Sequence, residues 1–529
     1  MERRARRALG AVISFRGRFG ERNGQKDFWA IGIESCWGYA VMPIIQFGQW
    51  LPDQAGFGNP GAITATNVVP TASGYGPVKS FISETNALDS RPTGALSLKD
   101  LSGNVRQYAG DAAKLYERVS QTWTDRSKSG GYSTPDSGAW EFTRWKNKVL
   151  ATNFADNPQQ IELGGTAFSD LTTDVKGKHI DVVGDFVVVG NTEDTTDGHV
   201  QNRVRWSAIG DETDWTVSAA TLSDYQDIKT GGAVERIVGG EFGLIIMERS
   251  VYRMTFVGAP IAFQFDEILP NIGTISPGSV ARDGDRVYFL SERGFFVISG
   301  SDARPIGDAR IDKTVLADLD IKNAGRMSAT ADVGSKRILW AYPGAGNVGG
   351  RPNKIVVYDQ TLDRWSLIEQ DVELLYRASG VGVDLESLDA MSSSIDTLDV
   401  SLDDPSLQGD VAILGAFNSS FEAGSFSGPN MVATLDTKEV ELTPGRNTRV
   451  NGFTAIVDGG TITAKVGSRD RTNAVPIFGP ELSQMSSGRF AARSNARYHR
   501  FRVQIEGEWD HAIGVQVVPR ESRIGGRRG

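Results

Sequence analysis

Short apolar bursts, each preceded by a polar turn, recur along most of the chain. They read GDFVVVG at Gly184–Gly190, GEFGLIIM at Gly240–Met247 and GDRVYFL at Gly284–Leu290. A strand that is covered on one face alternates apolar and polar residues, whereas a strand covered on both faces is apolar throughout. The bursts therefore predict short strands with both faces buried, and we expect them to be inner strands of stacked sheets.

The bursts repeat at intervals close to those of a known repeat architecture. Most intervals between the preceding turns are 37 to 56 residues, and the last is 75. Such periods are typical of β-propeller blades, four-stranded sheets that must stack on neighbours around a ring because one blade cannot bury its own faces. We expect an all-β fold with a propeller of about seven blades. The turn markers are Gly103, Asn147, Gly184, Gly240, Gly284, Gly334 and Gly409.

Glycine stands in most of these turns beside Asp, Glu or Ser. Glycine adopts positive φ at no steric cost, and the small polar residues bond their own backbone in turns. We therefore assign a structural role in the blade turns to four glycines. They are Gly184, Gly240, Gly284 and Gly334.

Paired aromatic residues mark hairpins along the same repeat. A Trp placed after a hairpin can cover the edge of the next blade and bury about 200 Å². Ordinary hairpins with core tryptophans would contain the same residues, but a matched spacing of seven in two of the pairs favours blades. The pairs are Tyr116 with Trp123, Tyr358 with Trp365 and, at a spacing of nine, Trp206 with Trp215.

The remaining pattern divides the chain into regions. Helical periodicity is confined to Asp312–Asp320, about two turns. Alternating strands begin near Met431 and predict either the last blade or a small, additional β-sandwich. The expected regions are a leader at 1–41, a propeller at 42–430 with an Asp-, Ser- and Leu-rich insertion at 381–406, C-terminal strands at 431–520 and a basic flexible tail at 521–529.

The leader differs from the rest of the chain in charge. Residues 1–41 hold eight basic and four acidic groups, whereas the whole chain carries a net charge of −9. An Arg-rich, acid-poor segment can be a targeting peptide or a DNA-binding arm. Arginine-rich ends are also common as solvated tails. We expect a disordered or misassigned extension, with the folded protein beginning at Met42.

Composition narrows the possible classes of protein. The 61 glycines among 529 residues exceed the average share of about 7% and fit many tight turns. No segment approaches the roughly 20 apolar residues of a membrane-spanning helix. The single cysteine, Cys36, excludes a disulfide framework, and no histidine has the spacing of a zinc site. The scattered histidines are His179, His199, His499 and His511.

No candidate motif for catalysis or cofactor binding has the neighbouring elements or spacing that its chemistry needs. GAGNVG at Gly344–Gly349 leads into another strand, so no helix N-terminus is available for a dinucleotide phosphate. NTEDTTDG at Asn191–Gly198 lacks the spacing of a calcium loop. No G-x-S-x-G elbow occurs, although an acid pair for glycoside hydrolysis stays open. We expect no catalytic residue, no cofactor, no metal and no enzymatic activity.

Several segments resemble one family of viral proteins. They are LPDQAGFGNPGAITATNVVPTASGYGPVKSF at Leu51–Phe81, RVRWSAIGDETDW at Arg203–Trp215 and DGDRVYFLSERGFFVISG at Asp283–Gly300. The pattern is similar to that of tail hub, or nozzle, proteins of short-tailed bacteriophages and covers most of residues 45–520. The basic leader has no counterpart in this pattern.

The resemblance implies a structural role in the virion tail after assembly in the host cytoplasm. It implies a homo-oligomeric ring, a hexamer by analogy, that docks on the portal adaptor and carries tail fibres or a needle. DNA would pass through the ring without sequence-specific binding, and an acidic protein would not trap it. The alternative function is a carbohydrate-binding or glycan-cleaving propeller associated with the tail.

Overall fold

The computed structural model describes residues 44–380 and 412–521. The leader with Cys36, the insertion at 381–406, the marker Gly409 and the tail from residue 522 lie outside the described residues. Within them the regular secondary structure is nearly all β-strand, and the one α-helix is α1 (Asp312–Asp318). Two short 3-10 helices, η1 (Pro277–Ser279) and η2 (Ile321–Arg326), precede strands. The helix agrees with the predicted Asp312–Asp320.

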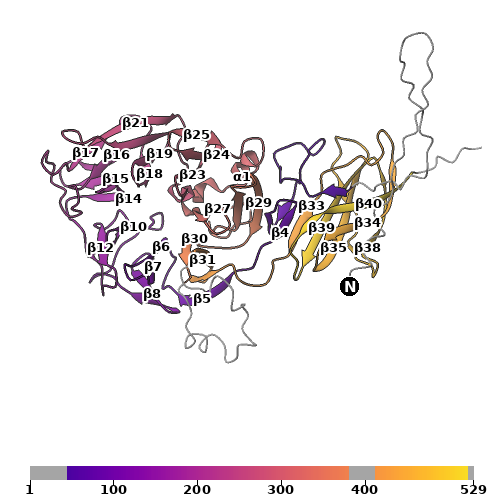
Figure 1. Ribbon diagram of the computed structural model, residues 1–529, viewed down its shortest axis with the longest axis horizontal. Coiled ribbons are helices and arrows are strands. Elements are labelled where there is room, and N and C mark those ends of the chain that lie inside the picture. The colour runs from indigo at the N-terminus through magenta and orange to yellow at the C-terminus, as the bar shows by residue number, and fades with distance from the viewer. Residues whose placement is uncertain (1–43, 381–411, 522–529) are drawn as a thin grey trace, which may run out of the picture. The chain divides into compact units, whose positions relative to one another are not determined.

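Seven antiparallel groups of four strands form the larger part of the fold (Figure 1). Blades 1 to 3 are β6 (Gly94–Lys99), β7 (Val105–Gly110), β8 (Leu115–Val119) and β9 (Thr122–Asp125); β10 (Glu141–Trp145), β11 (Lys148–Thr152), β12 (Gln159–Glu162) and β13 (Ser169–Asp170); and β14 (Lys176–Val183), β15 (Phe186–Asp194), β16 (Gly198–Trp206) and β17 (Asp224–Asp227).

The other four blades continue in chain order except for one strand. Blades 4 and 5 are β18 (Val234–Val238), β19 (Gly243–Met247), β20 (Ser250–Phe256) and β21 (Phe263–Pro270); and β22 (Ala281–Asp283), β23 (Arg286–Ser291), β24 (Gly294–Ser299) and β25 (Asp302–Pro305). Blades 6 and 7 are β26 (Ser328–Asp332), β27 (Arg337–Tyr342), β28 (Lys354–Asp359) and β29 (Arg364–Glu369); and β30 (Leu374–Ser379), β31 (Ala412–Phe417), β32 (Glu422–Ser425) and β5 (Ile82–Ala87).

The blades close into a ring. Except between blades 4 and 5, the first strand of each blade contacts the first strand of the next, and β30 of blade 7 contacts β6 of blade 1. Blades 4 and 5 are joined through a shared apolar cluster that includes Leu244 and Phe289. The outer strand of blade 7 is β5, which precedes blade 1 in the chain and pairs with β32. The prediction of a β-propeller with about seven blades is confirmed.

The apolar bursts occupy the second strand of each blade, which is an inner strand of its sheet, as predicted. The reason is that the second strand has a hydrogen-bonded neighbour on each side and a blade against each face. All five residues of β19 are buried, for example. The innermost strands have one edge on the ring axis, and they carry charged residues such as Glu141 and Arg236.

The turn glycines divide into two groups. Gly184, Gly240 and Gly284 have φ values of 56°, 143° and 62°, in the region that glycine tolerates best. Gly334 is not among the positive-φ residues, and in its turn Lys336 takes that conformation with φ of 55°. Three of the four glycines thus have the positive φ that the turn pattern predicted.

A β-sandwich accompanies the propeller. One sheet holds β1 (Ile44–Gln46), β3 (Val68–Pro70), β4 (Tyr75–Pro77), β34 (Thr448–Val457), β38 (Arg489–Ala496) and β40 (Ala512–Glu521). Facing strands are β2 (Ala65–Thr66), β33 (Ala433–Asp436), β35 (Thr461–Arg469), β36 (Ile477–Phe478), β37 (Leu482–Ser483) and β39 (Tyr498–Glu506). Phe453 of β34 packs on Phe501 of β39 with ring centroids 4.9 Å apart.

The sandwich contains residues that were expected to belong to the propeller, whose predicted start was residue 42. Residues 44–77 supply four of its strands, because β1 and β4 pair with β40 and β2 pairs with β33. The C-terminal strands form this separate layer pair and do not complete the last blade. The propeller proper therefore begins at β5.

A continuous sheet connects the sandwich to blade 6. Strand β2 pairs in parallel with β29 through Thr66 and Leu367, and pairs with β33 on its other side. Asn67 reinforces the joint: its backbone N–H donates to Leu367 O at 2.7 Å, and its Oδ1 accepts from Glu369 N at 2.9 Å. The ten-stranded sheet that results makes hinge motion at this joint costly.

The N-terminus of α1 is capped from a distant part of the chain. Asp53 accepts hydrogen bonds from Lys313 N at 2.9 Å and from Thr314 N at 2.7 Å. The Thr314 hydroxyl donates to the same carboxylate at 2.6 Å. A carboxylate at a helix N-terminus satisfies free N–H groups and interacts favourably with the helix dipole.

We expect Asp53→Ala to lower the free energy of unfolding by about 1 to 2 kcal/mol. Asp53→Asn keeps an acceptor oxygen and should lose roughly half as much. Urea denaturation of the full chain measures both values. Equal stability of Asp53→Ala and the unchanged protein would show that the cap does not contribute.

Candidate functional site: the central cavity

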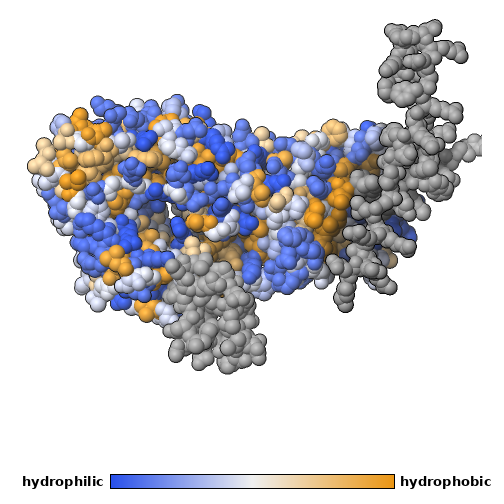
Figure 2. All heavy atoms as spheres, in the orientation of Figure 1, coloured by the Kyte–Doolittle hydropathy of each residue, from blue (hydrophilic) through white to orange (hydrophobic). Residues whose placement is uncertain are grey.

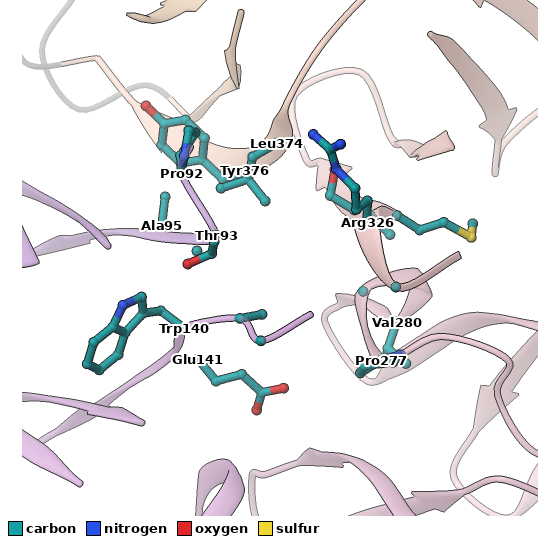
Figure 3. A pocket seen from close by; sticks show the side chains of 18 of the residues that line it. Pro92, Thr93, Ala95, Trp140, Glu141, Pro277, Val280, Arg326, Leu374 and Tyr376 are labelled. Atoms are coloured by element: carbon teal, nitrogen blue, oxygen red, sulfur yellow. The ribbon is translucent and has the colours of Figure 1, made fainter. Parts of the chain in front are cut away.

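A cavity of about 1030 Å³ lies where the innermost strands of the seven blades converge. Figure 3 shows its wall: Thr93 and Ala95 from the blade 1 side, Glu141 from blade 2, and Leu374 and Tyr376 from blade 7. Central cavities of this size are within the range of small-molecule sites. The charged groups on the wall therefore determine which ligands the cavity can bind and whether it can transfer protons.

Glu141 connects three blades across this wall. It is the first residue of β10 and only 6% exposed. Its Oε1 accepts a hydrogen bond from His179 Nδ1 of blade 3 at 2.8 Å and from Arg236 Nη1 of blade 4 at 2.5 Å. Its Oε2 accepts from Ile180 N at 3.3 Å. A buried carboxylate needs such partners, because an unpaired buried charge is very costly.

These partners keep Glu141 ionised. Burial alone would raise its pKa, but the charge of Arg236 and the hydrogen bonds from His179 and Ile180 outweigh that effect and hold the pKa at about 2. A general acid at neutral pH needs a pKa shifted the other way. Glu141 therefore serves as an anionic link between blades and not as a proton donor.

His179 completes a carboxylate–imidazole pair that resembles part of a catalytic triad. Its side chain is 1% exposed, and its Nε2 is buried without a hydrogen-bond partner in the described part of the chain. Nε2 is the atom that would accept a proton from a nucleophile. Because it is shut off from solvent, the pair lacks a nitrogen that a substrate can reach.

Other carboxylates at the inner strands are also used to hold blades together. Asp181 of blade 3 accepts from Thr143 Oγ1 of blade 2 at 2.8 Å and from Gly239 N, next to blade 4, at 2.7 Å. Glu373, 1% exposed, lies 2.5 Å from Arg326 Nη2 and 2.5 Å from Arg351 Nε. Asp181, Glu141 and Glu373 are thus committed to contacts within the ring.

A carboxyl group with a raised pKa lies elsewhere. Burial, with smaller contributions from the neighbouring acids Asp53 and Asp308, raises the pKa of Asp312 to about 7. Its Oδ1 accepts from Phe295 N at 3.1 Å, and Asp312 does not line the cavity. The residues described here therefore do not place a raised-pKa acid beside a second acid in the cavity.

The predicted aromatic residues lie between blades and away from the cavity. Trp123 of blade 1 packs on Phe417 of blade 7 with centroids 5.6 Å apart, and its Nε1 donates to Thr85 Oγ1 of β5 at 3.0 Å. Tyr116 belongs to the same apolar cluster. Trp206 packs on Phe263 of blade 4 at 5.1 Å.

The remaining aromatic residues also lie in the apolar contacts within and between blades, away from the cavity. Trp215 joins the cluster between blades 2 and 3 together with Trp145. Trp365 packs on Phe295 of blade 5 at 5.1 Å, and Tyr358 lies directly opposite Trp365 in its hairpin.

The two pairs with a spacing of seven lie in hairpins of different register. The turn between β8 and β9 has two residues, so Trp123 pairs with Arg118 and not with Tyr116.

The motifs that lacked a chemical context belong to hairpins. Residues 344–349 lie between β27 and β28, and 191–198 run from the end of β15 through the turn at 195–197 to the first residue of β16. There, Asp194 Oδ1 accepts from Thr196 N at 2.9 Å and from Asp197 N at 2.7 Å. No group of three or more His, Cys, Asp or Glu residues suited to a metal ion occurs in residues 44–380 and 412–521.

Sequence reasoning did not find Glu141, His179 and Arg236. They are 38 and 57 residues apart along the chain and form no motif. A usable signal was their place in the repeat: each precedes the turn marker of its own blade by four to six residues, on the innermost strand. A charged residue at that position faces the ring axis or an adjacent blade.

Together the sheets and the cavity define a seven-bladed β-propeller joined to a β-sandwich. The sequence matches no family model and no curated protein. Among the described helices, none is both long and apolar enough to cross a membrane.

Solved structures of other propellers are similar to this chain only in outline. BBS1N in complex with ARL6DN is 12% identical over 66% of this chain and 96% of that chain, with a TM-score of 0.38. BamB from Moraxella catarrhalis is 9% identical over 68% and 92%, with a TM-score of 0.34. YCF48 bound to D1 peptide is 11% identical over 54% and 86%, with a TM-score of 0.31. Likenesses this weak say nothing about what this chain binds.

Proposed function

We propose that this protein is a structural, non-enzymatic ring component, the tail hub or nozzle of a short-tailed bacteriophage. In this role it assembles into a ring, a hexamer by analogy, below the portal and its adaptor, extends the DNA exit channel and docks fibres or a needle. The observation that carries the proposal is the use of the cavity acids as links between blades. Glu141 and Glu373 form ion pairs within the ring, and the lowered pKa of Glu141 makes it unsuited to donate a proton.

The joint between propeller and sandwich supports the same role. A ring subunit transmits load between its neighbours and needs rigid parts. The sheet that runs from blade 6 through β2 into the sandwich supplies such a part.

Exposed apolar side chains supply candidate contacts between subunits (Figure 2). On the propeller, Phe256, Val257 and Ile261 at the β20–β21 turn are 43%, 52% and 65% exposed. On the sandwich, Val475 and Ile477 are 82% and 76% exposed. Two different patches on one chain favour a head-to-tail contact, which closes into a ring when the rotation permits.

The alternative is a carbohydrate-binding or glycan-cleaving propeller. It would require acids that converge in one pocket, with a raised pKa on one of them. The cavity offers a carboxylate, Glu141, with a lowered pKa instead.

Light scattering of the purified chain and a reducing-end assay on bacterial polysaccharides test the proposal. We expect light scattering to give the mass of an oligomer and the assay to detect no release of reducing ends. Ile261→Asp should reduce the mass toward that of one chain, because it buries a charge in an apolar contact. Val348→Asp, at a position that is 75% exposed on the β27–β28 loop, is the matched control and should leave the mass unchanged. A monomer that cleaves polysaccharide would overturn the proposal.

A further inference from the structure

Positive charge accumulates in the central cavity although the chain as a whole is acidic. Seven of the residues that line the cavity are Lys or Arg, and four are Asp or Glu. The whole chain has a net charge of −9. The cations are Arg91, Lys178, Arg236, Arg282, Lys322, Arg326 and Arg377, and the acids are Asp136, Glu141, Glu235 and Glu373.

Three cations are neutralised by acids within the wall. Arg236 pairs with Glu141, Arg326 with Glu373, and Lys178 lies 3.6 Å from Glu235. These pairs account for three of the four acids. The cavity therefore retains an excess of positive charge, and the excess belongs to the other four cations.

Those four cations form no ion pair within 4 Å of a carboxylate oxygen among the described residues, although Arg91 interacts at longer range with Glu373 and Asp136, and Lys322 with Asp320. Arg91 donates to the backbone carbonyl of Asp136 at 2.7 Å. Arg282 donates to two backbone carbonyls, those of Gly239 and Gly284. Arg377, on β30, and Lys322, on η2, make no side-chain hydrogen bond within residues 44–380 and 412–521 and are exposed.

Two guanidinium groups lie close enough at one rim of the cavity to repel each other. Arg91 precedes β6, and Arg326, which is labelled in Figure 3, precedes β26. Burial and the nearby charge of Arg326 lower the pKa of Arg91. A bound anion would relieve this repulsion.

We propose that the central cavity binds a small multivalent oxyanion, attracted by the excess positive charge of Arg91, Arg282, Arg377 and Lys322. Guanidinium groups present a planar fork of donors that matches phosphate and carboxylate oxygens, which identifies the class of ligand. The enclosed volume of about 1030 Å³ suits a small molecule. A polymer such as DNA would need a basic track on the surface, which the acidic chain disfavours. This proposal is independent of the ring function.

Calorimetric titration of the full chain, at constant ionic strength, tests the proposal with inorganic pyrophosphate and with citrate. We expect one site per chain, and the tighter of the two probes identifies a phosphate or a carboxylate ligand. Arg377→Gln should weaken binding about ten-fold, because it removes one charged hydrogen-bond donor. Since Arg377 makes no side-chain hydrogen bond within residues 44–380 and 412–521, this variant should unfold at the same temperature as the unchanged protein.

The matched control is Arg446→Gln. Arg446 is exposed in a turn of the sandwich, outside the cavity, and its replacement should leave the affinity unchanged. The proposal is overturned if neither probe binds, or if both variants bind equally well. Binding of a single-stranded oligonucleotide without binding of pyrophosphate or citrate would also overturn it.

Discussion

Glu141→Gln is expected to lower the free energy of unfolding by about 3 to 5 kcal/mol, the usual effect of breaking a buried ion pair. The amide cannot neutralise Arg236, and when its oxygen takes the place of Oε1, its NH2 group faces the Ile180 N–H that Oε2 now accepts from. The change therefore loosens blades 2, 3 and 4 at the same time. Urea denaturation of the full chain, followed by tryptophan fluorescence, gives the value.

Glu235→Gln is the matched control in the same cavity. Glu235 lies 3.6 Å from Lys178, whose side chain is 40% exposed, so the pair is weak. We expect a loss below about 1 kcal/mol. Losses of equal size in the two variants would contradict the role given to Glu141.

The effect of Glu141→Gln should depend on pH. Because the pKa of Glu141 is about 2 in the folded protein and 4.5 as a free side chain, its stabilisation is fully present above pH 4.5. That stabilisation is lost as the pH falls from 4.5 toward 2. The stability difference between the unchanged protein and Glu141→Gln should narrow over this interval, and a constant difference would show that the charge of Glu141 is not responsible.

Gly424→Ala is expected to cost about 3 kcal/mol and to detach the strand that closes the ring. Gly424 of β32 lies opposite Ser83 of β5. A Cβ atom at Gly424 would overlap the backbone carbonyl oxygen of Ile82, which cannot move without breaking the pairing. Hydrogen exchange should show loss of protection in β5 and β32 before the other blades.

Gly325→Ala provides the control for this substitution. Gly325 lies in η2, and an added Cβ would meet nothing within 4 Å. We expect a change in stability below about 0.5 kcal/mol. If Gly424→Ala were equally mild, β5 would not be needed to hold blade 7 in place.

The propeller was predictable because its strongest signal is local. A second strand such as β19 has both faces covered, so its burial appears as an uninterrupted apolar run after a turn. Six of the seven turn markers lie among the described residues, and each of the six precedes a second strand. The seventh, Gly409, lies just before β31.

The closing strand and the sandwich were less predictable because they depend on distant partners. Strand β5 reads ISETNA, has no apolar run, and pairs with β32 more than 300 residues away. Thr66 likewise pairs with Leu367. Such pairings are set by the register of complete sheets and leave little trace in a short window.

The cavity charges were hidden for a related reason. Glu141, His179 and Arg236 each stand alone in the sequence, and only stacking of blades 2, 3 and 4 brings them together. The aromatic pairs were visible at once, yet they lie between blades and serve packing.

Single-particle electron microscopy of the purified full chain, alone and with a portal adaptor, tests the central claim most directly. The account predicts a ring of subunits in which each subunit shows seven radial sheets, with β5 completing the seventh. Isolated single chains in both samples, or a propeller left open between blades 7 and 1, would contradict it.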